Sequence, residues 1–362
     1  MMSVRFEVKT RSRTYPVTIG QNILNSISEY LKKPTGRIFV ITDDVVSNLY
    51  LQELLQGLPS SELETVVFEL EHGEESKTLT SASKLYDFLV ENFATRSDTI
   101  LAFGGGVVGD VAGFVASSFK RGMRLVHVPT TLLAQVDSTV GGKTGINLAA
   151  GKNLVGTFYQ PHEVVIDVCI LRSLSESEFA AGIAEVIKYG VIMDYQLLQF
   201  LMNETVKILE RDPGTVATLV AKALENKKTI IELDETEDRG KREVLNFGHT
   251  IGHAIETCSN HSILHGQAVA IGMVEEARLA VERGLLERAA LESLIQVLCR
   301  FGLPTVIPRE IDVEKINEVV RQDKKVRSGQ LIIPVLIGLG KTEIMVVRDL
   351  NLISNNGEDI QC

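Results

Sequence analysis

Four of the seven histidines fall within residues 245–266. They are His249, His253, His261 and His265. His249 and His253 are four residues apart, so on a helix both side chains share one face, a spacing that metal sites commonly use. The expected third ligand is a carboxylate from a neighbouring helix, and Glu185 is a candidate because an unpaired charge is costly in its otherwise apolar run. The alternatives are hydrogen-bonded structural histidines and a surface role for Glu185.

A glycine-rich segment, GGGVVG at 104–109, satisfies the pattern G-x-G-x-x-G. It follows an expected strand at 99–103 and precedes a helical pattern that begins near Asp110. Glycines there let the backbone approach a pyrophosphate, which the helix N-terminus stabilises. No carboxylate follows about 20 positions later, where one usually binds the ribose. The segment is therefore either a nucleotide site or a tight turn. If a nucleotide binds, the candidate ribose contacts are Asp43, Glu74 and Lys77.

Residues 129–156 form a second polar segment, rich in Gly, Thr, Ser and Lys for the interior of an α/β domain. This composition suits a phosphate or polyol site, because ammonium, amide and hydroxyl groups lie among glycines. A solvated loop is the alternative. The residues singled out here are Asp137, Lys143, Lys152 and Asn153.

Several further cations lie beside these segments, and together they favour an anion pocket over a set of solvated helix faces. They are Arg121, Lys188, Lys227, Lys228, Arg242, Lys324 and Lys325. The chain carries 37 Lys+Arg and 47 Asp+Glu, a net charge of -10, which argues against nonspecific binding to nucleic acid. A small anionic substrate is not excluded, because it meets only its local pocket.

The first 170 residues supply the elements that must hold the glycine-rich segments. Short apolar or β-branched runs alternate there with amphipathic stretches, which is typical of a mostly parallel sheet with covering helices. The expected strands are residues 37–42, 64–70, 98–104, 124–130 and 163–168. No such alternation continues beyond residue 174.

The second half is predominantly helical in pattern. Ser175 and Glu178 fit a capping box that begins the first helix. The expected helices are residues 176–209, 214–234, 244–258 and 264–300, followed by a β-hairpin within 330–350.

The predicted fold class is therefore α/β plus all-α. A Rossmann-like α/β domain is expected over 1–174 and a helical domain over 175–362, in agreement with about two domains for 362 residues. Junctions between such domains are favoured ligand sites. No apolar run reaches the roughly 20 residues of a membrane span, and residues 1–13 lack an apolar signal core, so we expect a cytoplasmic protein.

In their order and spacing these segments resemble one family, the 3-dehydroquinate synthases of the sugar-phosphate cyclase superfamily. The resemblance runs through nearly the whole chain. It is carried by GGGVVGD at 104–110, RG at 121–122, PTTLLAQVDSTVGGKTGIN at 129–147, GKNLVG at 151–156, AEVIKYG at 184–190 and LNFGHTIGHAIE at 245–256. It implies a homodimer with an N-terminal NAD-binding domain, a C-terminal metal-binding domain and an active site in the cleft between them.

The resemblance also implies roles for individual residues. Zinc or cobalt would be held by Glu185, His249 and His265, while His253 would serve the substrate and proton transfer. NAD contacts would fall on Asp43, Glu74, Lys77, Gly104, Gly105, Gly106, Val107, Val108, Gly109, Asp110, Thr130, Thr131, Lys143, Lys152 and Ser173. Substrate contacts would fall on Asp137, Lys143, Lys152, Asn153, Lys188, Lys227, Arg242, Asn246, His253 and Lys324, with Arg121 reaching across from the partner subunit.

The chain departs from the family pattern in a few places. His72 stands where the family has Asp in an Asp-Gly-Glu triplet, and Ser173 replaces a Thr. Counting back from Asp234 favours Lys227 over Lys228 as the substrate contact. The choice between Lys324 and Lys325 stays open.

The implied activity is that of a phosphorus–oxygen lyase of the shikimate pathway, which leads to chorismate and the aromatic amino acids. It converts 3-deoxy-D-arabino-heptulosonate 7-phosphate to 3-dehydroquinate and phosphate through transient oxidation by NAD, β-elimination of phosphate, reduction and aldol closure. Alternatives are a sibling sugar-phosphate cyclase, a metal-dependent alcohol or glycerol dehydrogenase with net redox, and a non-catalytic NAD-binding protein.

Overall fold

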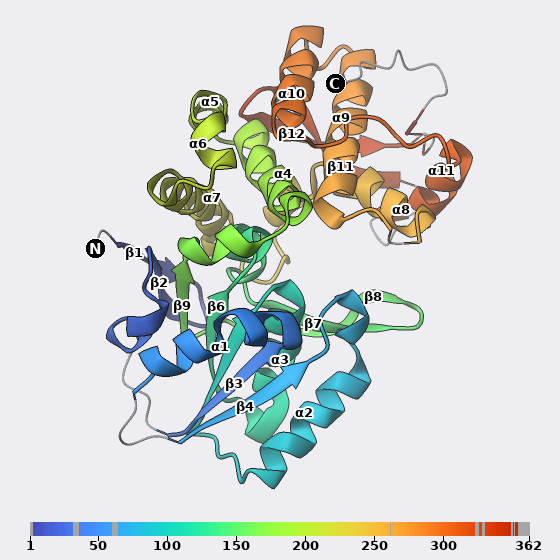
Figure 1. Ribbon diagram of the computed structural model, residues 1–362. Coiled ribbons are helices and arrows are strands. Elements are labelled where there is room, and N and C mark those ends of the chain that lie inside the picture. Colours follow the sequence, from blue (N-terminus) through green and yellow to red (C-terminus); the bar gives the residue numbers. More distant parts are fainter. Residues whose placement is uncertain are drawn as a thin grey trace. The chain divides into compact units, whose positions relative to one another are not determined.

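The computed structural model describes residues 3–31, 36–59, 64–260, 262–322, 326–327, 330–348, 350 and 352–353. The chain forms two compact units, coloured from blue to red along the sequence in Figure 1. Unit 1 comprises residues 1–174 and 216–224, and unit 2 comprises 175–215 and 225–362. The first division falls where the sequence places a domain boundary, whereas 216–224 groups with unit 1 instead of the expected helical domain.

Unit 1 contains a seven-stranded sheet with the strand order β1-β2-β9-β6-β5-β3-β4. The first pair is antiparallel and the other neighbouring pairs are parallel. The strands are β1 (Val4–Lys9), β2 (Thr14–Gly20), β3 (Ile38–Asp43), β4 (Thr65–Leu70), β5 (Thr99–Gly104), β6 (Arg124–Pro129) and β9 (Glu163–Asp167). All five expected strands are confirmed, with ends shifted by at most one residue. The first two strands were not expected.

Helices cover both faces of this sheet, and its central strands β3 and β5 are accordingly mostly apolar and buried at every position. Phe39 and Ile41 pack with α2 (Leu79–Glu91) and α3 (Gly106–Ser118), while Ile38 and Val40 pack with α1 (Asp44–Gly57) and η1 (Leu24–Glu29). Alternate residues of one strand thus belong to two cores, as the two-residue period requires.

A separate two-stranded hairpin in unit 1, β7 (Lys143–Leu148) and β8 (Gly151–Phe158), occupies the segment read from the sequence as a loop or ligand site. Glycines within both strands interrupt the alternation of apolar and polar residues by which a strand is recognised in a sequence. Gly156 must lack a side chain, because a Cβ there would lie 2.2 Å from the carbonyl oxygen of Thr144. Short helical turns complete the unit: η2 (Glu74–Ser76), η3 (Phe119–Arg121), η4 (Ala134–Ser138) and η5 (Val168–Ser173).

His127 makes the stability of unit 1 depend on pH. Burial lowers the pKa of this β6 side chain to about 4. Between pH 6.5 and pH 4 the unfolded chain therefore takes up a proton that the folded chain does not, and stability falls as pH falls. We expect the unfolding free energy to be about 2 kcal/mol lower at pH 5 than at pH 7.5 from this group. Urea unfolding of His127→Asn should lack this contribution; equal pH dependence in both proteins would contradict it.

Unit 2 is mostly helical, with a three-stranded antiparallel sheet. Its helices are α4 (Glu176–Ile192), α5 (Tyr195–Asn203), α6 (Thr205–Leu209), α7 (Pro213–Leu233, shared with unit 1), η6 (Arg242–Asn246), α8 (His249–Cys258), α9 (His265–Glu282), α10 (Arg288–Arg300) and α11 (Val313–Arg321). Its strands are β10 (Val326–Arg327), β11 (Gln330–Gly338) and β12 (Lys341–Val347). The expected hairpin is confirmed.

Three of the expected helices were too long. The one at 176–209 divides into α4, α5 and α6, with Asp194 capping α5 by accepting the Leu197 N–H at 3.0 Å. The one at 264–300 breaks at Gly284, and the one at 244–258 begins late, after Gly248; both glycines have positive φ. Among the described residues, no helix is both long and apolar enough to cross a membrane.

Candidate active site

Helix α4 places a buried carboxylate and a buried ammonium one turn apart. The helix begins at the predicted cap, where Oγ of Ser175 accepts the Glu178 N–H at 3.2 Å. Most of its length is buried, including Glu185 at 1% and Lys188 at 3% exposed. Nζ of Lys188 is in ion-pair contact with Oε2 of Glu185. Two charges this deeply buried indicate a functional site more than a stabilising pair.

Helices α8 and α9 bring three of the predicted histidines together. The ligand atoms of His249, His253 and His265 all lie within 4.8 Å of one another. Oε1 of Glu185 lies 3.4 Å from Nε2 of His249 and 3.8 Å from Nε2 of His265. His253 is the exposed member of the three, while the other two are partly buried. The fourth histidine of the stretch, His261, lies outside the described residues.

The carboxylate of Glu185 fits a bound cation. Its Oε2 pairs with Lys188, whereas its buried Oε1, which faces His249 and His265, accepts no hydrogen bond from the described residues. Two imidazole nitrogens and one carboxylate oxygen form the donor set expected of a catalytic zinc site with an open position. The three histidines alone are a second geometrically acceptable set.

Hydrogen bonds orient two of the imidazoles. Nδ1 of His249 donates to the Phe247 carbonyl at 3.2 Å, and Nδ1 of His265 donates to Glu256 at 2.9 Å. Both rings thereby turn Nε2 toward Glu185, as second-shell partners do at metal sites. Burial most strongly, and then the charge of Lys188, lowers the pKa of His249; burial also opposes protonation of His265, but Glu256 and Glu185 raise its pKa.

Sequence reasoning missed two carboxylates that support the histidines. Glu256 lies three residues after His253, so both side chains are on the same face of α8. This helical spacing could have identified Glu256 from the sequence as a carboxylate near the histidines. Glu276, fully buried on α9, accepts the backbone N–H groups of Gly248 at 2.7 Å and Thr250 at 3.2 Å. It therefore holds the start of α8, where an anion also meets the positive end of the helix dipole.

Three predicted substrate residues of unit 2 are buried or half-buried: Arg242, Lys227 and Asn246. Arg242 is 3% exposed, and its Nη1 donates to the Glu235 carbonyl at 2.8 Å. The buried Asp234 orders this loop by accepting several of its backbone N–H groups. Lys227 is buried, whereas Lys228 is partly exposed and pairs with Glu232 at 3.9 Å. Asn246 is half-buried at the end of η6, just before α8.

In unit 1 the predicted nucleotide contacts follow four neighbouring strands at one edge of the sheet. Thr130 follows β6, Gly105 follows β5, Asp43 ends β3, and Glu74 with Lys77 follows β4. The carboxyl edge of a parallel sheet is where such folds bind dinucleotides. Helix α3 begins at Gly106, earlier than the expected Asp110, so the glycines form its first turn and present backbone N–H groups.

Two of these residues are also bound within the protein. Oδ1 of Asp43 caps α1 by accepting the Val46 N–H at 2.9 Å, and burial raises its pKa. Nζ of the buried Lys77 contacts the Asp110 carboxylate, whose pKa burial raises and Lys77 lowers. Both residues therefore have structural roles beside the predicted ones.

Asn147 connects the predicted cofactor and substrate segments of unit 1, and the sequence reasoning did not single it out. Its Nδ2 donates to Glu74 at 2.8 Å, and its Oδ1 accepts the Asn153 N–H at 2.9 Å. Asn153 has a φ of 54°, a left-handed conformation that this bond helps to hold. The neighbouring predicted residues lie in η4, β7 and β8: Asp137, Lys143 and Lys152.

Other predicted residues lie apart from these groups or cannot be placed. Arg121 ends η3 just before β6, at the opposite edge of the sheet from the glycines. Ser173 accepts the Tyr50 hydroxyl at 2.8 Å and donates to the Ile170 carbonyl at 3.1 Å. Lys324 and Lys325 lie outside the described residues.

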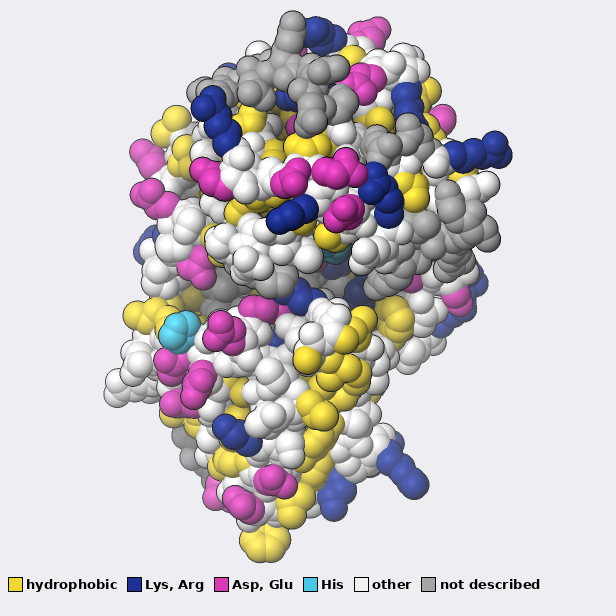
Figure 2. Space-filling view, turned by 90° about the vertical axis from the view of Figure 1, so that its right-hand side faces the viewer, with side chains coloured by type: hydrophobic (Ala, Val, Ile, Leu, Met, Phe, Trp, Pro, Cys, Tyr) yellow, Lys and Arg dark blue, Asp and Glu magenta, His cyan; other side chains and the backbone are white. Residues whose placement is uncertain are grey.

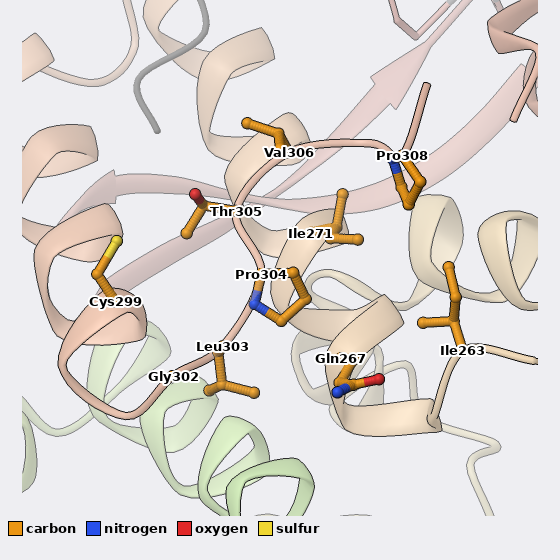
Figure 3. Close-up of a pocket in the computed structure, with 10 residues that line it drawn as sticks. All are labelled: Ile263, Gln267, Ile271, Cys299, Gly302, Leu303, Pro304, Thr305, Val306 and Pro308. Carbon is orange, nitrogen blue, oxygen red and sulfur yellow. The ribbon is translucent and has the colours of Figure 1, made fainter. Parts of the chain in front are cut away.

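A cavity of about 590 Å³ in unit 2 does not coincide with the candidate site (Figure 3). It lies between α9 and the segment 302–308, and its lining contains none of the predicted metal or substrate residues. Helical geometry turns Gln267 and Ile271 of its wall away from His265. The chemistry of the histidines, and not cavity size, identifies the site.

Comparison with known proteins gives matches over most of the chain. Residues 67–181 match the family model for the 3-dehydroquinate synthase N-terminal region, and residues 182–326 match that for its C-terminal region. A 3-dehydroquinate synthase of Desulforamulus reducens is 42% identical over 341 residues, covering 93% of this chain and 95% of that protein. One of Halorhodospira halophila is 44% identical over 336 residues, covering 92% and 93%.

Solved structures share the fold over nearly the whole chain. A 2-deoxy-scyllo-inosose synthase complexed with carbaglucose-6-phosphate, NAD+ and Co2+ has a TM-score of 0.87 and 26% identity, covering 96% of this chain and 98% of that chain. A 2-epi-5-epi-valiolone synthase from Streptomyces hygroscopicus with NAD+ and Zn2+ has 0.86 and 25%, covering 95% and 96%. A probable glycerol dehydrogenase from Sinorhizobium meliloti, 17% identical with a TM-score of 0.63, covering 84% and 88%, shares the fold alone.

Proposed function

The chain belongs to the 3-dehydroquinate synthase family, and from this premise we propose how its residues divide the reaction. The enzyme converts 3-deoxy-D-arabino-heptulosonate 7-phosphate to 3-dehydroquinate and phosphate, a step of the shikimate pathway, with NAD and zinc or cobalt as cofactors. A bound metal supplies a Lewis acid that lowers the pKa of a substrate hydroxyl, and NAD supplies a reversible hydride acceptor.

In unit 2, Glu185, His249 and His265 are proposed to hold the metal. The buried Oε1 of Glu185, which lies near Nε2 of both histidines and accepts no hydrogen bond from the described residues, is the observation that carries this assignment. His253 is left as the exposed imidazole beside that set, in position to take the proton of the hydroxyl. The buried cations Lys188, Lys227 and Arg242, with Asn246, are proposed to bind the carboxylate and hydroxyls of the substrate.

In unit 1, the carboxyl-edge residues are proposed to bind NAD. The backbone N–H groups of the first turn of α3 would face the pyrophosphate, and Asp43 with Glu74 the riboses. Lys152 and Asn153 are proposed to hold the substrate phosphate, with Lys143 beside them and Asp137 as a second proton carrier. The link from Asn147 to both Glu74 and Asn153 supports a shared cofactor and substrate region.

One assay separates this activity from the alternatives. Phosphate should be released from the seven-carbon substrate without accumulation of NADH at 340 nm, and a chelator should abolish the release. A net dehydrogenase would accumulate NADH, and a sibling cyclase would release phosphate faster from a six-carbon sugar phosphate such as glucose 6-phosphate. Either result would overturn the substrate assignment.

A homodimer that pairs through β8 is also proposed. Leu154, Val155 and Phe158 of this strand are 56%, 37% and 44% exposed, and its outer edge pairs with no strand of the described residues. Figure 2, viewed from the side where β8 lies in Figure 1, shows an apolar stripe down unit 1. Exposed apolar edge strands favour association, and a twofold copy would satisfy both edges. Arg121 would then serve the site of the partner.

We also propose that the protein is located in the cytoplasm.

Charged substitutions on β8 should give monomers. Leu154 and Phe158 are four residues apart and share one face of the strand. Leu154→Lys with Phe158→Lys removes this apolar face and adds like charges across a twofold interface, so we expect half the wild-type mass by light scattering after gel filtration. The matched control is Leu49→Lys on α1, which is 54% exposed and should keep the wild-type mass. A dimer that survives the β8 changes would exclude this interface.

A further inference from the structure

Helix α8, which carries two of the clustered histidines, begins without a side-chain cap of its own. Its cap position is Gly248, which has a φ of 77° and no side chain that could accept an N–H of the first turn. A side chain does not fit there, because a Cβ would lie 2.5 Å from Cγ of Met273 and 2.8 Å from the carbonyl oxygen of Val269. Another element must therefore supply acceptors for the first N–H groups of this buried helix end.

Glu276 of the neighbouring helix α9 supplies these acceptors. Its Oε2 accepts the Gly248 N–H at 2.7 Å, and its Oε1 accepts the N–H groups of Thr250 at 3.2 Å and Ile251 at 3.4 Å. Both oxygens act as acceptors, as those of an ionised carboxylate do. Glu276 and the residues that it binds are buried, so removal of the carboxylate would leave buried donors without an acceptor.

Glycines let α8 and α9 approach closely enough for this contact. The two helices lie side by side (Figure 1). A Cβ at Gly272 of α9 would lie 2.0 Å from the carbonyl oxygen of Gly248. His265, Gly272 and Glu276 are spaced so that they share one face of α9, within an arc of about 40°. One face of α9 therefore carries a clustered histidine, the close contact with α8 and the carboxylate that holds α8.

The placement of α8 decides where its first histidine lies. His249 is the first residue of the helix, and Glu276 accepts backbone N–H groups on both sides of it. Nε2 of His249 lies 3.4 Å from Oε1 of Glu185, while Nε2 of His265 on α9 lies 3.8 Å from the same oxygen. Because Glu276 ties α8 to α9, it fixes the two imidazoles relative to each other, and metal affinity depends on such supporting contacts.

The charge of Glu276 also favours a cation at this place. The N-terminus of a helix carries the equivalent of roughly half a positive charge. His249 and His265 are the first residues of α8 and α9, so both lie at such ends. Two positive helix ends oppose the binding of a divalent cation beside them, and a buried carboxylate at one end offsets that repulsion.

We propose that Glu276 is a positioning residue of the metal site: it raises the affinity of the proposed ligands for a divalent cation by tying α8 to α9 and offsetting the dipole of α8. It acts through the backbone of α8 and does not itself coordinate the ion. This role rests on the proposed function, in which Glu185, His249 and His265 hold the metal.

The test is the affinity of the full-length protein for Co2+, measured by titrating the metal-free form while the visible absorption of the bound ion is recorded. Glu276→Gln keeps the size of the side chain, but it removes the charge and replaces one acceptor oxygen by an N–H donor. We expect Co2+ affinity to fall roughly 10-fold to 100-fold, the range typical of groups that support metal ligands. A purely structural role would lower the stability of the protein and leave the Co2+ affinity of the folded form unchanged.

Two further variants control the result. Glu275→Gln removes the adjacent buried carboxylate of α9, which pairs with Arg278 at 4.0 Å, and it should bind Co2+ as the wild type does. Glu276→Asp keeps the charge but shortens the side chain by one methylene, so its affinity should lie between those of the wild type and Glu276→Gln. It also provides the measurement if circular dichroism shows that Glu276→Gln does not fold.

Wild-type Co2+ affinity in every folded variant of Glu276 would overturn the proposal. An equal loss of affinity in Glu275→Gln would also overturn it, because that result would show a general effect of removing buried charge from α9. Failure of the proposed ligand set gives a different result, in which His265→Ala binds Co2+ as tightly as the wild type. A loss in His265→Ala with none in Glu276→Gln would exclude only the role of Glu276.

Discussion

Replacing His265 with alanine should remove the metal and reduce phosphate release by roughly 1,000-fold or more. Its Nε2 is one of two imidazole donors next to Glu185, and a Lewis acid at the reacting oxygen is worth several kcal/mol of barrier. Metal content by mass spectrometry and the visible absorption of the Co2+ form report the loss independently of activity. Full turnover in the metal-free variant would sink the site assignment.

Two further variants make the His265 test specific. Glu256→Gln keeps a hydrogen-bond acceptor for His265 but removes the charge, so metal affinity should fall about 10-fold to 100-fold. Thr257→Ala, one residue along on the exposed side of α8, should leave both metal content and turnover unchanged. A graded series of this kind separates loss of a ligand from loss of the fold.

Replacing Arg242 with alanine should weaken substrate binding roughly 100-fold while NAD binding changes little. A hydrogen-bonded charge contributes about 1.5–3 kcal/mol, and Arg242 lies in unit 2, whereas the predicted NAD contacts are in unit 1. Calorimetry with each ligand measures the two affinities separately. Equal losses for both would contradict the assignment.

The Arg242 substitution also needs controls for structure. The side chain is buried against the Glu235 carbonyl, so some loss of stability is expected as well. Arg242→Lys keeps the charge but not the planar fork, and it should bind substrate with intermediate affinity. Arg239→Ala changes an exposed arginine of the same loop and should behave as the wild type.

The ends of the five expected strands were predictable from the sequence to within one residue. The strands β3, β5, β6 and β9 are mostly apolar runs that end at aspartate, glycine or proline, and burial on both faces leaves no other register. The cap at Ser175 and the helical spacing of His249 and His253 followed from the same local rules. Helix ends were less predictable, because Asp194 before α5, and Gly284 between α9 and α10, interrupt a continuing amphipathic pattern.

Supporting residues were harder to predict than ligands. Asn147, Glu256 and Glu276 act only through the groups that they bind, and each partner lies on another element or another turn. Burial also distinguished Lys227 from Lys228, adjacent residues that the sequence separated only by counting. The hairpin β7–β8 was missed because its glycines serve backbone packing and break the strand pattern.

The sequence by itself determined which chemistry is available: the glycine turn for a pyrophosphate, the histidines for a metal, the family and its reaction. These depend on residue types at fixed local spacing, which a linear pattern retains. Only the tertiary structure decided that Oε1 of Glu185 lies within 4 Å of two imidazoles without accepting a hydrogen bond from the described residues. Those proximities arise from packing between elements, which local periodicity does not encode.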